Sequence, residues 1–230
     1  SCCAAAAGGG HLNVIRFLRE GITPPCPWDA QTPARAAAGG HVKVLECCIG
    51  YGCEWDQSSI MRRAAASGHL HVLKWARAKG CEWGFGVAAN AAEAGHLEVL
   101  TWAVANGCEC NKYVMDCAAR GGSIPVLTWL QSVCGVPFDE YTCASAAAAG
   151  RLDALIWLKA QGCPWNAMTC TRAASGGHFE VLRWARKAGC PWDENVVLRC
   201  AAVGCMDMLA WALDNGCPWR GTGWTSPDDV

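Results

Sequence analysis

The chain has 230 residues, a formal net charge of −1, 52% hydrophobic residues and 17% charged residues. This composition excludes a disordered chain, and the near-zero charge excludes a protein that holds nucleic acid or acidic lipid through a strong global field. Helix-forming residues are abundant, and apolar stretches are short and interrupted, so we predict an all-α fold without a transmembrane helix.

A repeat of 27 or 28 residues, with one longer first interval of 30, runs along the whole chain. Each unit places a Gly before an anchor residue, then an apolar segment, then a turn of the type Cys-Pro-Trp or Cys-Glu-Trp. The anchors are His11, His41, His69, His96, Ser123, Arg151, His178 and Cys205. Eight units at one period predict a solenoid of stacked helix pairs. The first unit is already under way at Ser1, so we expect the sequence to begin within a longer array.

The first helix of each unit is predicted to end in an Ala-Ala-x-x-Gly pattern, as at residues 91–95. An Asp or Asn precedes this helix in most units, and its side-chain oxygen can accept hydrogen bonds from the first turn. The predicted N-caps are Asp29, Asp56, Asn111, Asp139, Asn166 and Asp193. Thr32-Pro33 offers an alternative start in the second unit, with Pro at the first helical position.

The second helix of each unit is predicted from a wide apolar stripe. In the third unit the stripe contains Leu70, Val72, Leu73, Trp75 and Ala76, as expected for a helix that packs between neighbours. The Gly that ends each second helix is predicted to adopt a left-handed conformation. These glycines are Gly52, Gly80, Gly107, Gly135, Gly162, Gly189 and Gly216.

Residues 31–45, Gln-Thr-Pro-Ala-Arg-Ala-Ala-Ala-Gly-Gly-His-Val-Lys-Val-Leu, resemble the ankyrin repeat pattern T-P-L-H-x-A-A-x-x-G-H-x-x-V-V. The resemblance covers residues 1–220, the first repeat being partial, and is nearest to the short, Trp- and Cys-rich ankyrin repeats of protist and giant-virus proteins. An ankyrin repeat has about 33 residues. The resemblance therefore implies an ankyrin-like solenoid of about eight helix-turn-helix repeats with shortened β-hairpin turns. Residues 221–230 are interpreted as a polar C-terminal tail.

The repeated cysteines and histidines are interpreted as structural. Stacked helices lie roughly 8–10 Å apart, whereas a disulfide needs Cα atoms within about 7 Å. The sequence has no C-x-x-C pair, so the cysteines are predicted to fill the seam between repeats, a single metal or disulfide pair being the alternative. The histidines are predicted to brace the turns through hydrogen bonds to backbone. These markers are His41, His69, His96 and His178.

The tryptophans form two series, one in the turns and one on the second helices. The second-helix series is Trp75, Trp102, Trp129, Trp157, Trp184 and Trp211. A Trp spaced by one repeat is what a stacked core needs, so we predict core positions. The alternative, a platform for nucleic-acid bases, requires basic residues between the rings. The turns carry acids instead, among them Glu54, Asp56 and Asp193.

Recognition is predicted at positions that differ between units. One column precedes the anchors by about ten residues and a second by two or three, and in ankyrin-like units both flank the concave side. The candidate partner-binding residues are Phe85, Lys112, Tyr113, Glu140, Tyr141, Met168, Glu93 and Arg120. A third, basic column could attract an acidic segment, or it could simply keep the array in solution. It contains Arg35, Arg63, Arg172 and Arg199.

We therefore expect a non-enzymatic scaffold that binds another protein through the concave face of the array. No catalytic residues, metal, cofactor, nucleic acid or membrane are expected, and the chain is expected to be a monomer in the cytoplasm or nucleus. Two alternatives remain open. One is an accessory repeat region of a larger multidomain enzyme, and the other is a metal- or redox-responsive protein that uses its cysteines.

Overall fold

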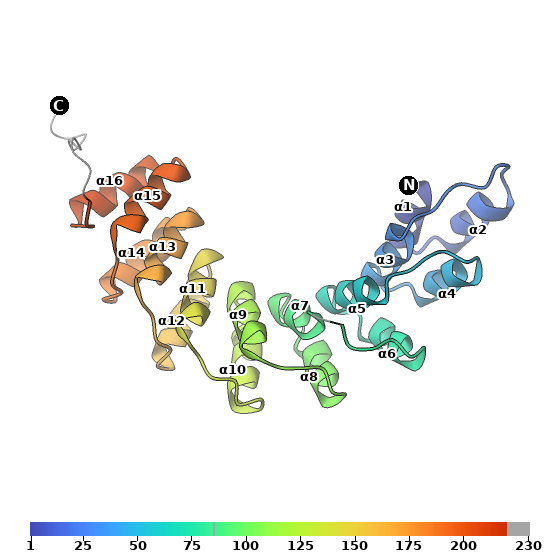
Figure 1. The fold of residues 1–230 in the computed structure, drawn as a ribbon, viewed down its shortest axis with the longest axis horizontal. Coiled ribbons are helices and arrows are strands. Elements are labelled where there is room, and N and C mark those ends of the chain that lie inside the picture. The colour runs from blue at the N-terminus through green and yellow to red at the C-terminus, as the bar shows by residue number, and fades with distance from the viewer. Residues whose placement is uncertain (85, 220–230) are drawn as a thin grey trace. The chain divides into compact units, whose positions relative to one another are not determined.

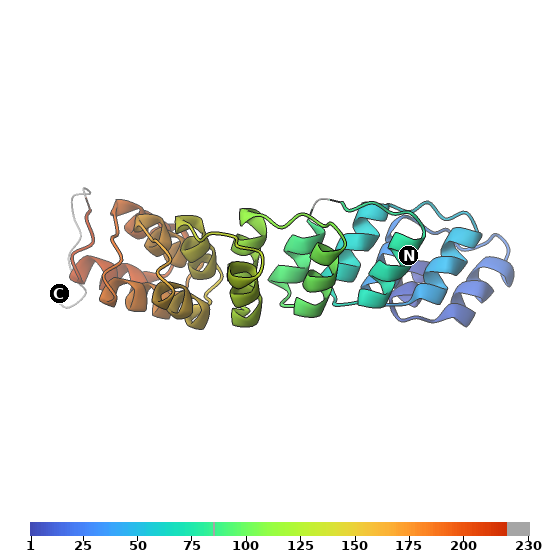
Figure 2. The same cartoon turned by 90° about the horizontal axis from the view of Figure 1, so that it is seen from below.

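The computed structural model describes residues 1–84 and 86–219, and every regular element within them is an α-helix. Sixteen helices follow one another in these residues as consecutive pairs, which confirms an all-α helical repeat array. The chain divides into two compact units, Ser1–Cys110 and a second unit that begins at Asn111. In each unit the odd-numbered helices form one row and the even-numbered helices another (Figure 1 and Figure 2).

The first helices of the pairs are α1 (Cys2–Gly8), α3 (Gln31–Ala38), α5 (Gln57–Ala66), α7 (Val87–Glu93), α9 (Lys112–Gly121), α11 (Glu140–Ala148), α13 (Ala167–Ser175) and α15 (Glu194–Ala202). The second helices are α2 (Leu12–Glu20), α4 (Val42–Gly50), α6 (Leu70–Ala78), α8 (Leu97–Ala105), α10 (Ile124–Ser132), α12 (Leu152–Ala160), α14 (Phe179–Lys187) and α16 (Met206–Asp214). In the part of the chain that the structure describes, none of these helices has the length and apolar character needed to cross a membrane.

Alanine lets the first helices pack directly against one another. In the second unit, α11 lies between α9 and α13 and buries Ala144, Ala146 and Ala147. Small side chains at a helix contact allow the axes to approach closely. The second helices supply the larger core residues, such as Leu155 and Leu158 of α12, both fully buried. The first-helix row is therefore held at close, regular spacing within each unit.

Five of the predicted N-caps are confirmed by side-chain hydrogen bonds to the first turn. They are Asp56, Asn111, Asp139, Asn166 and Asp193. The alternative start at Thr32-Pro33 is wrong, because α3 begins at Gln31 and Thr32 is buried inside its first turn. The Asp29 carboxylate lies one residue before the N-cap and accepts from the Gln31 amide at 3.1 Å.

The turn between the two helices of a pair depends on a left-handed glycine. Gly177 has φ +72° and its amide donates to the Ala174 carbonyl, while the His178 amide reaches back to the Ala173 carbonyl. This double hydrogen bond is the Schellman pattern, which suits glycine because a Cβ would be strained at positive φ. Gly80 closes α6 in the same way at φ +84°, which confirms the predicted left-handed end of the second helix.

The turns that connect one pair to the next contain no strand in the described residues. The segment from Cys190 to Asp193 shows why, since only four residues separate the glycine that ends α14 from the start of α15. Pro191 also removes a backbone donor from this segment. The turns where shortened β-hairpins were expected therefore contain no hairpin strands in residues 1–84 and 86–219.

The anchor histidines tie each pair to the pair before it. The His178 Nε2 lies 3.1 Å from the Ala148 carbonyl at the end of α11, and His69 makes the equivalent contact with Ala38 at 2.9 Å. Equivalent contacts are made by His41 to Gly8 and by His96 to Ala66. The predicted hydrogen bonds to backbone are confirmed, and the carbonyl they reach belongs to the preceding first helix. Where Arg replaces His, the Arg151 Nε donates to the Arg120 carbonyl at 3.1 Å.

The second-helix tryptophans are half-buried rather than in the core as predicted, because most of their rings pack against an aromatic residue of a connecting turn. Five of the six pack on the turn aromatic of the preceding pair, with ring centroids 5.7–6.2 Å apart. The pairs are Trp55–Trp75, Trp83–Trp102, Phe138–Trp157, Trp165–Trp184 and Trp192–Trp211. Trp129 is also half-buried. These tilted and edge-on contacts are a favourable geometry for aromatic pairs.

A basic residue near the end of the second helix donates a hydrogen bond to the following turn and covers the turn tryptophan. The Arg77 guanidinium donates to the Cys81 carbonyl at 2.6 Å and lies 4.8 Å from the centre of the Trp83 ring. Three further basic residues repeat both contacts, namely Arg19, Lys159 and Arg186. A cation over an indole face is attracted by the ring quadrupole. These tryptophans and basic side chains therefore interact with each other within the fold.

The turn cysteines are more than apolar filler. Cys163 donates to the carbonyl of Asp139 at 3.4 Å, which joins the end of the pair α11–α12 to its beginning. The same bond joins Cys53 to Asp29, Cys190 to Asn166 and Cys217 to Asp193. Burial raises the pKa of Cys217 to about 11. A thiol with this pKa stays protonated at neutral pH and can act as a donor.

Candidate functional site

Two adjoining hollows lie on the first helices of the second unit. The first has a volume of about 250 Å³ and is lined by Tyr113, Asp116, Arg120, Tyr141, Ala144, Ser145, Ala148 and Arg172. The second has a volume of about 550 Å³ and is lined by Met168, Thr171, Arg172, Ser175, Asp193, Asn195 and Arg199. Arg172 belongs to both hollows, so together they form one surface along α9, α11, α13 and α15. We call this surface the tyrosine–arginine face.

The two tyrosines are exposed because of where they lie in their helices. Tyr113 and Tyr141 each follow an N-cap by two residues, in the first turns of α9 and α11. Their exposed fractions are 47% and 55%, large values for aromatic side chains. Cys117, one helical turn along α9, raises the pKa of Tyr113 more than any other group does. The Tyr113 phenol is therefore neutral at physiological pH. Both side chains expose part of an aromatic ring at the surface.

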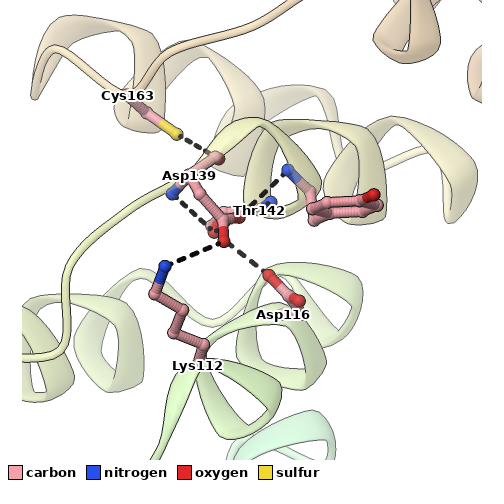
Figure 3. Close-up of polar contacts among 6 residues, drawn as sticks. Lys112, Asp116, Asp139, Thr142 and Cys163 are labelled. Carbon is pink, nitrogen blue, oxygen red and sulfur yellow. Dashed lines mark hydrogen bonds and ion pairs between the residues drawn. The ribbon is translucent and has the colours of Figure 1, made fainter.

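A polar cluster next to the first hollow links α9 to α11, and Asp116 belongs to both the cluster and the lining of the hollow. The Thr142 hydroxyl lies 3.1 Å from Asp116 Oδ1 and 3.4 Å from Asp139 Oδ1 (Figure 3). The Lys112 ammonium pairs with the other Asp139 oxygen at 3.6 Å, and the Tyr141 amide donates to Oδ1 at 3.0 Å. Burial raises the pKa of Asp116. This cluster sets the register of the two helices that present the tyrosines.

Arg120 is held in place at the end of α9. Its guanidinium lies 3.0 Å from the Cys117 thiol, and its own carbonyl accepts from Arg151. Arg172 and Arg199 are different, because they are exposed on α13 and α15 and form no ion pair or side-chain hydrogen bond within the described residues. The tyrosine–arginine face therefore presents two exposed guanidinium groups beside two exposed aromatic rings.

The carboxylates of the face are already engaged by the protein. Asp116 accepts from Thr142, and Asp193 accepts from the amide and the side chain of Asn195 at 3.1 Å each. Neither forms an ion pair with Arg172 or Arg199. The positive charge of the two arginines is therefore directed toward solvent, where an incoming anionic group would meet it.

The structure brings together only some of the candidate residues. Tyr113, Tyr141 and Arg120 line the first hollow, and Met168 lines the second with a half-buried side chain. Lys112 is engaged with Asp139, and Glu140 is half-buried at the first position of α11. Glu93 is exposed at the end of α7 in the first unit, so it does not belong to this face. Phe85 lies outside the described residues.

Sequence reasoning missed Asp116 and Ser145, although a signal for both was present. Positions three, four and seven apart share one face of a helix. Asp116 and Arg120 follow Tyr113 at intervals of three and seven, and Ser145 follows Tyr141 at an interval of four. Following the helix face that contains each tyrosine would have predicted that Asp116 and Ser145 line the hollow. The sequence pattern puts the basic residues and the tyrosines in different columns, whereas the structure places Arg172 in the same hollow as the tyrosines.

Residues 1–84 and 86–219 contain no group of three or more His, Cys, Asp or Glu side chains placed to hold a metal ion. The comparisons with known proteins add no assignment. No family model matches this sequence, and a search of curated proteins also gave no match.

Proposed function

We propose that the chain is an ankyrin-like repeat array that performs no catalysis itself and binds another protein on the tyrosine–arginine face. The family assignment is supported by the Gly-His turns, by the capped Ala-rich first helices and by the match of residues 31–45 to the ankyrin pattern. On that assignment, the column that contains both tyrosines flanks the concave side, where such arrays bind their partners.

One observation carries the proposal: two exposed tyrosines on adjacent first helices border a hollow that also contains Arg120 and Arg172. Tyr and Arg are enriched among the residues that dominate binding energy at protein interfaces. A tyrosine contributes a large apolar contact with little loss of side-chain freedom. The other aromatic rows are used within the fold, because turn rings pack on second-helix rings and under basic side chains.

The proposal includes a reducing compartment, the cytoplasm or nucleus. The turn thiols of Cys163, Cys190 and Cys217 each donate a hydrogen bond to a capping residue, and only reduced cysteine can do so. Reduced cysteines persist where glutathione and thioredoxin keep thiols reduced. These hydrogen bonds therefore support both a reducing compartment and a structural role for the repeated cysteines.

Removing both tyrosines is expected to abolish partner capture. The chain and its Tyr113→Ala/Tyr141→Ala variant would each be immobilised, and proteins retained from a lysate of the source organism would be quantified by mass spectrometry. Truncating two hot-spot residues costs about 2 kcal/mol or more in total, so the true partner should fall at least about tenfold. The matched control is Phe17→Ala/Val133→Ala, which removes two side chains that are 61% and 66% exposed elsewhere.

The expected result is a protein that the control retains and the tyrosine variant loses, with both variants melting at the temperature of the parent chain. Retention of the same proteins by all three chains would contradict the proposed function.

A further inference from the structure

We infer that the segment held on the tyrosine–arginine face is an acidic peptide in an extended conformation, with an apolar side chain between Tyr113 and Tyr141 and carboxylates against Arg172 and Arg199. This inference rests on the proposed function and names the chemistry of the partner. Its basis is the order of groups along four adjacent first helices: two tyrosines, then two arginines.

Charge complementarity selects an acidic partner. Arg172 and Arg199 are exposed and unpaired in the described part of the chain. The two carboxylates that line the same hollows, Asp116 and Asp193, accept hydrogen bonds from Thr142 and Asn195. A guanidinium presents a rigid fork that matches a carboxylate. A partner with Asp or Glu here gains two such pairs, whereas a basic partner would be repelled.

The spacing of the helices selects an extended chain. Adjacent packed helices lie roughly 8–10 Å apart, and an extended peptide advances about 3.3 Å per residue. Peptide residues three positions apart therefore match one step between first helices. Four helices correspond to about eight to ten peptide residues, with the two carboxylates three positions apart over α13 and α15.

The two hollows accept different parts of this peptide. The first hollow, about 250 Å³, lies between the tyrosine rings and has Ala144 and Ala148 in its lining, which suits one apolar side chain. The second hollow, about 550 Å³, has the hydroxyl and amide side chains of Thr171, Ser175 and Asn195 beside the arginines. An acidic side chain can pair with an arginine there and keep its remaining oxygen near hydroxyl or amide donors.

The test uses random 12-residue peptides displayed on phage and selected on the full chain. The enriched peptides would be synthesised with a fluorescent label, and their dissociation constants measured at 0.1 M and 0.5 M salt. We expect Asp or Glu at two positions three apart, beside an apolar residue. We expect Arg172→Gln/Arg199→Gln to weaken binding about tenfold, and high salt to weaken it as well, because exposed charges are screened.

The matched control is Arg35→Gln/Arg63→Gln, which removes the same charge from the equivalent column of the first unit and should change binding less than twofold. Thermal melts would establish that every variant is folded. One outcome would overturn the acidic partner but not the proposed function. In that outcome the selected peptides contain no acidic residues, bind the Arg172→Gln/Arg199→Gln variant as tightly as the parent chain, and do not bind the Tyr113→Ala/Tyr141→Ala variant. Peptides insensitive to both changes would overturn both.

A competition with single-stranded poly(U) is a further test, with the phosphate concentration equal to the concentration of peptide carboxylates. Displacement of the peptide would also overturn the inference, because the face would then bind anions without regard to their structure. A selected acidic peptide should resist this competition, since poly(U) cannot place an aliphatic side chain between the two tyrosines.

Discussion

Leu155→Ala is expected to lower the free energy of unfolding by about 3 kcal/mol, because it leaves a cavity in the core of the second unit. Leu155 is fully buried in α12, and its helix packs against α11, which presents Tyr141. In a repeat array each pair is stabilised mainly by its neighbours, so a loss in one pair also weakens its contacts with the next. The measurement is equilibrium unfolding in urea, followed by circular dichroism at 222 nm.

The control for this prediction is the next residue, Ile156, whose side chain is 40% exposed. Ile156→Ala removes a similar volume from the same helix, and a change below about 0.5 kcal/mol is expected for a surface position. Equal losses from the two variants would mean that α12 does not bury the face that the structure assigns to it.

Gly176→Ala is expected to cost about 3 kcal/mol, although Gly176 has an ordinary helical conformation. An added Cβ would lie 2.7 Å from the Ala148 carbonyl oxygen and 2.4 Å from the His178 ring. These are the two partners of the hydrogen bond that ties α14 to the preceding pair. The methyl group must therefore push the pairs apart or displace the histidine, and urea unfolding would measure the loss.

Gly189→Ala provides the contrast, because Gly189 has φ +86° and open space around it. Its cost should be about 1 kcal/mol, the strain of a left-handed alanine. If Gly176→Ala were no more costly than Gly189→Ala, the close approach of neighbouring pairs at the histidine would not be a source of stability.

Much of this fold is predictable because the same local signals, such as N-cap residues and helix-ending glycines, recur in most repeats. Asp139 and Asp193 are recognisable as caps from their place before a helix, and Gly80 from its place after one. The partner of a histidine is harder to predict. His178 was predicted to bond to backbone, but the carbonyl it reaches lies 30 residues away, at a position set by the stacking of two pairs.

The candidate site was predictable in part for a similar reason. Tyr113 and Tyr141 stand out because they break the repeat at equivalent positions. Which other side chains line the same hollow depends on how each helix is rotated about its axis. This rotation places Arg172, which belongs to the basic column, in the hollow of the two tyrosines. The tryptophans were placed too deep, since hydrophobic periodicity does not distinguish the core from the seam between neighbouring helices. Trp184, half-buried against Trp165, is an example.

The most direct test of partner binding on the tyrosine–arginine face is site-specific photo-crosslinking. The photo-reactive amino acid benzoylphenylalanine would be placed at Tyr141 in one version of the chain and at Ile156 in another, and each version would be irradiated in the source lysate. Both positions are exposed, and they lie on the first and second helices of the same pair. We predict one covalent adduct with a partner protein from position 141 and none from position 156. The same adduct from both positions, or an adduct from position 156 alone, would contradict binding on this face.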